Sequence, residues 1–292
     1  MERKKKIGVG MVLLGATLWG SSSNSVEYLM VDQHFTWSTI LFWRMICTGI
    51  SFLGICLFQK QDLLAPLKND WKWMMKFIVL GLYLMQVTFF KAIYYSNAAT
   101  ATVLQYTMPA ILLLMYLVKD RRLPTRREVL AGVLALLGTA LIATKGQGAS
   151  LAVSREALVY GILGAFGMAF YTAYAAVLLK KYSCFLILGW SSLGNALLLK
   201  LFHHPTLEGA VLDIHTAAAF GILFVLGTLV AYYVYLESTK YIPPAETGAL
   251  AAFEPLSAYF FSVAVMGNRV GPVELLGALC IIVMVCVLAR ND

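Results

Sequence analysis

Charged residues are scarce in this sequence. Aspartate, glutamate, lysine and arginine make up 13% of its 292 residues, hydrophobic residues make up 60%, and the mean hydropathy is +0.76. A soluble domain carries about 25% charged residues, so this composition excludes a soluble globular protein. Little sequence lies between the hydrophobic stretches, which leaves no room for a soluble catalytic domain.

Motifs that hold metals, disulfides or nucleotides are also missing. The cysteines are scattered without a Cys-x-x-Cys pair, so neither a zinc site nor a disulfide framework is expected. His203 and His204 stand apart from other candidate ligands, and no Gly-x-x-x-x-Gly-Lys-Ser/Thr loop is present to bind ATP. Aspartate-rich motifs for pyrophosphate chemistry are absent from the sequence as well. We therefore expect no metal, no cofactor and no direct use of ATP.

What the sequence does contain is ten apolar stretches, each long enough to span a bilayer, which takes about 20 helical residues. Backbone groups in hydrocarbon must be hydrogen-bonded internally, and the period-2 alternation of membrane barrels is absent, so the spans are expected to be helices. The predicted fold class is an all-α integral membrane protein with ten transmembrane helices. The stretches cover residues 7–30, 37–58, 72–94, 98–118, 127–145, 157–179, 184–203, 214–238, 245–266 and 271–289.

The distribution of basic residues predicts the orientation of these spans. With the N-terminus in the cytoplasm, 17 of the 23 lysines and arginines fall at cytoplasmic ends and four at outer ends, while Arg44 and Lys91 lie within spans. Positive charge concentrates on the cytoplasmic side of membrane proteins. We therefore expect a multi-pass protein of the cell (cytoplasmic) membrane with both termini in the cytoplasm. The net charge of +8 follows from this asymmetry, so contact with membrane lipids is expected and nucleic-acid binding is not.

An internal repeat is the second strong signal. Residues 76–143 align with residues 222–289 without a gap, and this register places Pro109 on Pro255, 146 residues apart. Residues 1–146 and 155–292 therefore read as two similar units of five spans each. An odd number of spans makes the second unit cross the membrane in the opposite sense, which is the inverted repeat of many secondary transporters.

Motifs in five predicted spans resemble one known family. Leu18-Trp19-Gly20-Ser21, Trp43-Arg44, Ala98-Ala99-Thr100 leading to Pro109, Phe253-Glu254-Pro255 and the stretch from Gly271 to Gly277 occur in the order and spacing typical of EamA-type transporters of the drug/metabolite transporter superfamily. Gly267-Asn268-Arg269 departs from the family, which often has Gly-Glu-Arg there. The resemblance implies a carrier for amino acids, nucleosides, metabolites or drugs, acting in export.

Two ionisable residues lie deep within predicted spans, where a charge costs about 2.5–3.5 kcal/mol. Glu254 is near mid-membrane and is followed by Pro255, which cannot donate a backbone hydrogen bond. Its carboxyl could hold a substrate ammonium, carry a proton or stabilise a helix contact. Arg44 could pair with Glu254, but we interpret Arg44, Pro109 and Pro255 as structural.

Two ion pairs are predicted at the ends of the bundle. Glu27 and Lys91 lie near the outer ends of their spans, where a pair between them would close the cavity. Lys91 aligns with Glu237 in the second repeat, at the inner end and near Lys180. A pair between Lys180 and Glu237 would mirror the outer one, so these four residues are candidate gating residues.

Polar and aromatic residues within spans predict the substrate pocket. Uncharged amides and phenols still need partners in hydrocarbon, and together they would line a mainly aromatic, weakly polar cavity suited to amino acids or other small amphipathic solutes. The candidate substrate-binding residues are Trp19, Asn24, Tyr83, Gln86, Gln105, Tyr171, Tyr232 and Glu254.

The sequence thus predicts a secondary transporter that exports a small organic solute by alternating access, with protons as a candidate coupling ion. Two alternatives stay open at this point. An intramembrane enzyme for a lipid-like substrate would need a cluster of acids or a histidine–acid pair near a membrane face, and neither is found in the sequence. A non-transporting channel or scaffold is the other.

Overall fold

The computed structural model describes residues 2–108, 125–144, 153–238, 240–242, 253–265 and 271–289, together with positions 110, 111, 114, 115, 118, 123, 247, 250, 251, 267 and 269. All regular secondary structure within these residues is helical. Five helical stretches among them are long and apolar enough to cross a membrane: Trp37–Phe58, Trp71–Tyr95, Arg155–Ala175, Cys184–His203 and Ile214–Ser238. The prediction of an all-helical membrane protein is therefore confirmed.

The helices of the two halves follow a similar order, and the first half contains the additional short helix α3. The first half contains α1 (Glu2–Val31), α2 (Trp37–Phe58), α3 (Ala65–Asn69), α4 (Trp71–Lys76), η1 (Phe77–Tyr83), α5 (Leu84–Tyr95), α6 (Ala98–Gln105) and α8 (Arg126–Thr144). The second contains α9 (Arg155–Leu178), α10 (Cys184–His203), α11 (Ile214–Gly221), η2 (Ile222–Val230), α12 (Ala231–Ser238), α14 (Phe253–Ala264) and α15 (Pro272–Ala289).

Short polar residues fix the starts of corresponding helices. Thr36 Oγ1 accepts a hydrogen bond from the amide of Thr39 at the start of α2, and Ser183 Oγ accepts one from Leu186 at the start of α10, both at 3.3 Å. Such caps satisfy amide groups that the first helical turn leaves without a partner.

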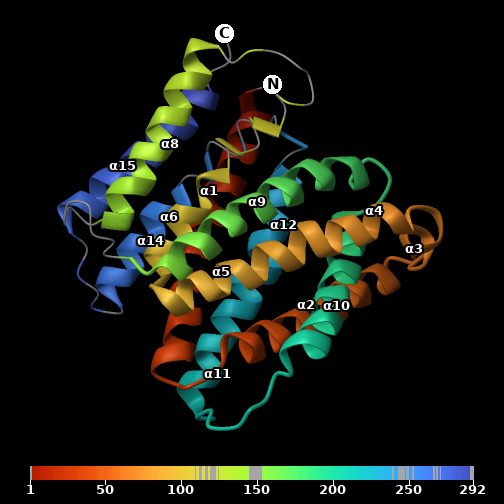
Figure 1. Cartoon of the computed structure of the whole chain (residues 1–292). Helices are drawn as coiled ribbons and strands as arrows, with labels where there is room; N and C mark the ends of the chain where they lie inside the picture. The colour runs from red at the N-terminus through yellow and green to blue at the C-terminus, as the bar shows by residue number, and fades with distance from the viewer. Residues whose placement is uncertain are drawn as a thin grey trace.

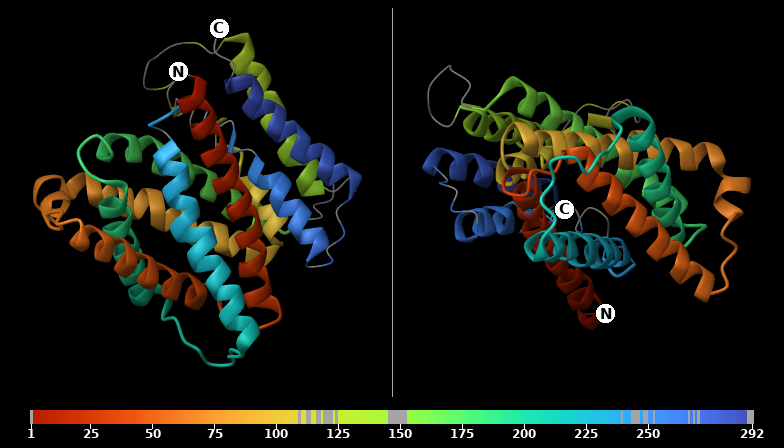
Figure 2. Two further views of the ribbon diagram at one scale, coloured as in Figure 1. Left: turned by 180° about the vertical axis from the view of Figure 1, so that it is seen from behind. Right: turned by 90° about the horizontal axis from the view of Figure 1, so that it is seen from below.

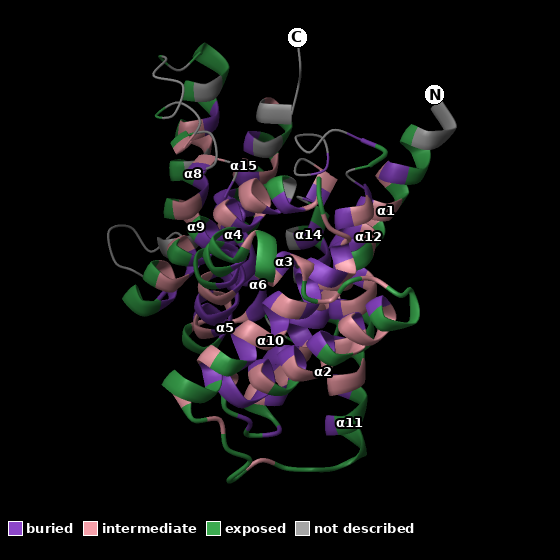
Figure 3. Cartoon of the chain, turned by 90° about the vertical axis from the view of Figure 1, so that its right-hand side faces the viewer, coloured by how far each residue is buried: buried purple, intermediate pink, exposed green. Residues whose placement is uncertain are grey.

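The helices surround a buried centre. The α2–α10 pair and the α8–α15 pair pack on opposite sides of the bundle, and α1 lies beside α12 (Figures 1 and 2). Helices α5 and α9 cross the middle next to α6, and α14 packs against α1 and α6 (Figure 1). Buried residues gather in this central region, whereas exposed residues mark the connecting loops (Figure 3). The centre is thus formed by helices from both halves of the chain.

Corresponding positions of the two halves make corresponding contacts. A Cβ built on Gly81 of η1 would lie 3.3 Å from Tyr171 Cα in α9, and one built on Gly227 of η2 would overlap Ser22 in α1. Gly81 and Gly227 are related by the offset of 146. Ser22 and Tyr171 lie 149 apart, which is the offset that aligns Leu14-Gly15-Ala16 with the similar Leu163-Gly164-Ala165 near the start of each half. The segment η1 of the first half therefore packs closely on α9, the first helix of the second half, and η2 of the second half packs closely on α1.

Both halves also contain a π-helical segment at the same place. The segments η1 and η2 share the Val-Leu-Gly sequence that ends at Gly81 and Gly227. In η2, Thr228 Oγ1 donates to the carbonyl oxygen of Leu223, five residues earlier, at 2.8 Å. Single π-helical turns are frequent at functional sites, and here both adjoin the buried centre.

Replacing Gly20 with alanine is expected to destabilise the protein by about 1–3 kcal/mol, the usual cost of overpacking. The new Cβ would overlap Ser257 Oγ and lie 2.6 Å from the amide nitrogen of Ala258, so α1 and α14 would have to separate. Gly10→Ala in the same helix is the matched control, because its Cβ would meet nothing within 4 Å. Thermal unfolding in detergent measures both variants, and equal midpoints for the two would contradict this packing.

Candidate functional site

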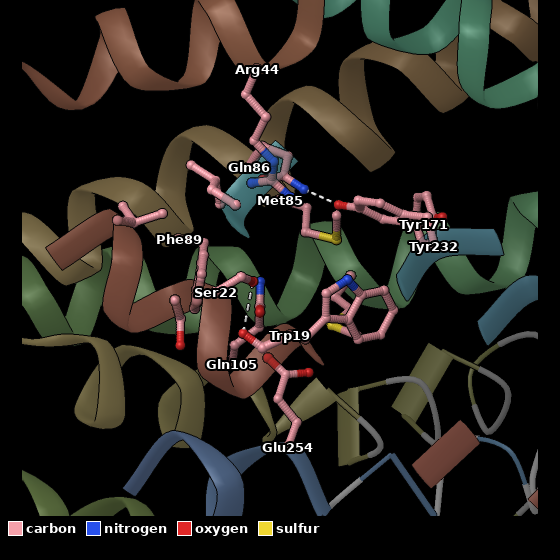
Figure 4. A pocket seen from close by; sticks show the side chains of 14 residues that line it. Trp19, Ser22, Arg44, Met85, Gln86, Phe89, Gln105, Tyr171, Tyr232 and Glu254 are labelled. Carbon is pink, nitrogen blue, oxygen red and sulfur yellow. Dashed lines mark hydrogen bonds between the residues drawn. The ribbon is translucent and has the colours of Figure 1, made fainter. Parts of the chain in front are cut away.

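A small pocket lies at the buried centre, between helices of both halves (Figure 4). Its volume is about 50 Å³, which is room for one or two water molecules. Its walls are mostly apolar or aromatic, with an arginine and a glutamate among them. The lining residues are Trp19, Ser22, Ser23, Val26, Arg44, Met85, Gln86, Phe89, Gln105, Met168, Tyr171, Leu223, Tyr232 and Glu254.

Arg44 reaches the pocket from α2 and is held by neutral groups. Its Nε donates to Thr228 Oγ1 at 2.6 Å and its Nη1 donates to Gln86 Oε1 at 3.2 Å. The guanidinium also lies 5.6 Å from the ring centre of Phe90 and 5.9 Å from that of Tyr232. These contacts orient the charge toward the pocket without neutralising it.

Gln86 and Tyr232 join the two halves directly. Gln86 Nε2 donates to the hydroxyl oxygen of Tyr232, and the two residues are equivalents in the repeat, 146 positions apart. This contact joins two positions that the repeat in the sequence makes equivalent.

Glu254 enters the pocket from the side opposite Arg44 (Figure 4). Tyr106 donates its phenolic proton to Glu254 Oε2 at 2.9 Å, and both side chains are buried. Among the described residues no ion pair joins Arg44 to Glu254. A guanidinium and a carboxyl group therefore face the same small pocket from opposite walls.

Six of the eight predicted substrate-binding residues line this pocket: Trp19, Gln86, Gln105, Tyr171, Tyr232 and Glu254. The other two make contacts elsewhere. Asn24 Nδ2 donates to the carbonyl oxygens of Gly20 and Ala258 at 2.9 and 3.2 Å, and Tyr83 hydroxyl lies 3.0 Å from His203 Nε2.

The sequence reasoning also missed pocket residues. Arg44, which the sequence analysis interprets as structural, also lines the pocket, and the sequence signal for this position is a lone charge within a span. Met85, Phe89 and Met168 could not be predicted as pocket residues, because an apolar residue in a span can equally face lipid, the core or a cavity.

Two of the residues interpreted as structural are prolines. Pro109 lies outside the described residues, and Pro255 lies within α14.

At the far end of the bundle, which carries residues 32–36 and 204–213, the candidate gating residues have separate partners. Glu27 Oε2 accepts a hydrogen bond from the amide of Ala98 at 2.7 Å, at the start of α6. Lys91 Nζ lies 3.4 Å from Tyr160 hydroxyl and 5.2 Å from the ring centre of Trp37. Aromatic side chains thus cover Lys91 at this end.

A larger cavity opens toward the near end, which carries residues 59–70 and 179–183. Its volume is about 550 Å³, and we call it the vestibule. Lys180 and Glu237 both line it, and Tyr171 lines both the vestibule and the central pocket. Glu237 Oε1 pairs with Lys240 at 2.7 Å, and this hydrogen bond raises the pKa of Lys240.

A contact at each end ties the start of one helix to a turn of the other half. At the near end, Tyr182 hydroxyl donates to Asp70 Oδ2 at 2.6 Å, and Lys181 Nζ lies 2.9 Å from Asp70 Oδ1. The bonds from Tyr182 and Lys181 lower the pKa of Asp70, so its carboxylate is ionised at neutral pH. At the far end, Thr216 Oγ1 donates to Gln33 Oε1 at 3.0 Å. Asp70 and Thr216 are 146 residues apart and Gln33 and Tyr182 are 149 apart, so the two contacts correspond.

The site holds no group of side chains suited to a metal within the described residues. Its groups are those of a binding site: one guanidinium, one carboxyl group, amides and phenols in an apolar enclosure.

Comparison with known proteins identifies the chain. The sequence pattern of the EamA-like transporter family matches residues 6–144 and again residues 155–290. The chain belongs to the EamA-like transporter family. This assignment confirms the predicted family and the prediction of a membrane transporter over an intramembrane enzyme.

One relative and one solved structure are similar to this transporter. It is 31% identical over 292 residues to the uncharacterized inner membrane transporter YicL of Salmonella typhimurium strain LT2, covering 98% of this chain and 96% of the relative. A protein crystal structure resembles it with a TM-score of 0.66 at 15% identity, covering 98% of this chain and 96% of the other. The second likeness shows the fold alone.

Proposed function

We propose that this transporter moves a small organic solute, such as an amino acid, a related metabolite or a drug, across the cytoplasmic membrane by alternating access. The observation that carries the proposal is the central pocket, which both halves build and which adjoins a vestibule at one end. Transporters built from inverted repeats bind their substrates at the repeat interface near mid-membrane. Export is the direction implied by the resemblance to the family.

The proposed architecture is ten transmembrane helices in two inverted five-helix repeats, residues 1–146 and 155–292. The paired glycine contacts, the paired π-helical segments and the paired end contacts support it, because each feature of one half recurs at the equivalent positions of the other half. Two units of opposite sense can exchange conformations, which converts an inward-open state into an outward-open one.

The near end is proposed to face the cytoplasm, with both chain termini. Lys180, Lys181 and Lys240 lie there, in agreement with the concentration of basic residues on the cytoplasmic side. The vestibule then opens inward, while Lys91, Trp37 and Tyr160 close the outer end. Location in the cytoplasmic membrane is also supported by the name of the relative YicL, an inner membrane transporter.

In this proposed inward-open state, Lys180 and Glu237 line the open vestibule. We propose that closing the vestibule brings them together as the inner ion pair, replacing the pair of Glu237 with Lys240. Glu27 and Lys91 are proposed to contribute to the outer closure.

Counterflow in liposomes tests the proposed function. Purified protein is reconstituted into vesicles loaded with an unlabelled amino acid, nucleoside or amphipathic cation, and uptake of the labelled form is followed. Transient accumulation of at least one solute, chemically unchanged, is the expected result. Failure of every solute class to exchange would contradict the proposal and favour a non-transporting scaffold.

A further inference from the structure

The near end of the bundle carries a cluster of lysines and tryptophans that line neither the central pocket nor the vestibule. Lys68, Lys72 and Lys76 follow one another at intervals of four residues on α3 and α4, and Trp71 and Trp73 stand between them. All five residues are exposed, and we call them the Lys/Trp patch. Helices α3 and α4 lie at the edge of the molecule, away from the buried centre (Figures 1 and 2).

The internal repeat shows that the fold does not require these side chains. At the offset of 146, the three lysines correspond to Ile214, Ala218 and Ile222, and the two tryptophans correspond to Ala217 and Ala219. That segment of the second half forms the helices α11 and η2 with small and aliphatic side chains at the same places. The patch is therefore a property of the near end alone.

The positive charge of the patch is not balanced by neighbouring acids. Lys72 and Lys76 are one helical turn apart, and like charges at this spacing destabilise a helix. Among the described residues neither lysine pairs with a carboxylate, and the carboxylate of Asp70 nearby is already paired with Lys181. An anionic group bound between Lys72 and Lys76 would turn their repulsion into attraction to a shared partner.

The two tryptophans add an apolar part to the same surface. Trp71 is 55% exposed and Trp73 is 40% exposed. Lys72 Nζ lies 5.8 Å from the ring centre of Trp71, and Lys76 Nζ lies 5.1 Å from that of Trp73, so each ammonium group stands beside an indole. Tryptophan at the end of a membrane span sits at the level of the lipid headgroups. A ligand of this surface thus meets positive charge and aromatic rings together.

Hydrogen bonds to the second half hold the segment that leads into the patch. Trp190 Nε1 donates to the carbonyl oxygen of Leu63 at 2.7 Å, and Ser183 Oγ lies 2.6 Å from Gln61 Oε1. The contact of Tyr182 with Asp70 fixes the turn between α3 and α4. Charges on a fixed backbone bind a partner with less loss of conformational entropy than charges on a loose loop.

We propose that the Lys/Trp patch binds an anionic phospholipid, with the lipid phosphate between Lys72 and Lys76, near Lys68, and the glycerol and acyl chains beside Trp71 and Trp73. Basic residues next to a membrane span attract anionic lipids, and the indoles favour a lipid over a soluble anion because a soluble anion leaves the rings without an apolar partner. The site lies outside the proposed transport pathway, so it does not rest on the proposed function.

Native mass spectrometry of the purified, delipidated protein tests the site. The protein is titrated with phosphatidylglycerol, which is anionic, and with phosphatidylcholine of the same acyl chains, which has no net charge. At least one phosphatidylglycerol is expected to bind at a concentration at least about tenfold lower than phosphatidylcholine. The same lipid should raise the midpoint of thermal unfolding in detergent, because it binds the folded protein. Inorganic phosphate and glycerol phosphate should raise this midpoint less.

A triple variant assigns the preference to the patch. In Lys68→Gln/Lys72→Gln/Lys76→Gln, the preference for phosphatidylglycerol over phosphatidylcholine should fall at least about tenfold. The preference compares two lipids within one variant, so it does not depend on the stability of that variant. If the glutamine variant does not fold, Lys68→Ile/Lys72→Ala/Lys76→Ile gives the same test with the side chains of the equivalent segment.

The matched control removes the same charge from other helices. Lys5→Gln/Lys6→Gln/Arg126→Gln alters exposed residues of α1 and α8 and should keep the preference. Equal binding of the two lipids by the unaltered protein would overturn the proposal. So would an equal loss of preference in the control, which would show an effect of net charge alone. Stabilisation by inorganic phosphate as strong as that by phosphatidylglycerol would show a soluble-anion site in place of a lipid site.

Discussion

Replacing Arg44 with glutamine is expected to reduce solute exchange in liposomes at least about tenfold. A hydrogen bond to a charged group contributes about 1.5–3 kcal/mol, and the variant loses those of the guanidinium to Thr228 and Gln86 as well as any to the solute. Gln86 Oε1 would lose its hydrogen-bond donor Arg44. Gln86 is also the residue that contacts its equivalent in the other half, Tyr232. The loss should therefore appear both in binding and in the rate of conformational exchange.

Two controls define this result. Arg155→Gln removes a charge from an exposed residue at the start of α9 and should leave exchange unchanged. Arg44→Lys keeps the charge but not the planar set of donors, so it should recover part of the activity. If Arg44→Gln remains folded by gel filtration and exchanges solute at the normal rate, Arg44 plays no part in the transport site.

Cross-linking position 180 to position 237 is expected to stop transport nearly completely. Both residues line the vestibule, and alternating access requires that cavity to close and reopen. The double variant Lys180→Cys/Glu237→Cys, in a background with the native cysteines replaced, would be locked closed by a short bifunctional maleimide. A disulfide formed by mild oxidation should have the same effect and be reversed by a reductant.

The matched control joins two positions on the same side of the vestibule. Glu237 and Lys240 already pair at 2.7 Å, so the same reagent on Glu237→Cys/Lys240→Cys should leave exchange at the level of that double variant before treatment. Complete cross-linking between positions 180 and 237 with undiminished transport would show that the vestibule does not close during the cycle.

The helical stretches and the internal repeat were predictable because hydropathy and residue spacing depend on the chain alone. The pocket was partly predictable for a related reason. Polar side chains such as Gln86 and Gln105 must find partners within the bundle, so their presence in a span points inward. The match of the family pattern to two segments agrees with the repeat seen in the sequence.

Contacts that depend on tertiary packing could not be predicted. Thr228 contacts Arg44 from a π-helical segment, and hydropathy does not distinguish such a segment from an α-helix. Glu27 caps the start of α6 at Ala98, although its position in the sequence pointed to Lys91. A charge at the end of a span can serve a helix terminus or another charge, and only the fold decides which.

The opposite orientation of the two halves is the claim on which this account depends, and cysteine labelling measures it directly. Lys6→Cys and Arg155→Cys, each in a cysteine-free background, place one exposed thiol at the start of each repeat. A membrane-impermeant maleimide is added to right-side-out and to inverted vesicles. The account predicts that position 6 reacts only in inverted vesicles and position 155 only in right-side-out ones. Reaction of both positions from the same side would contradict the inverted repeat and the alternating-access mechanism built on it.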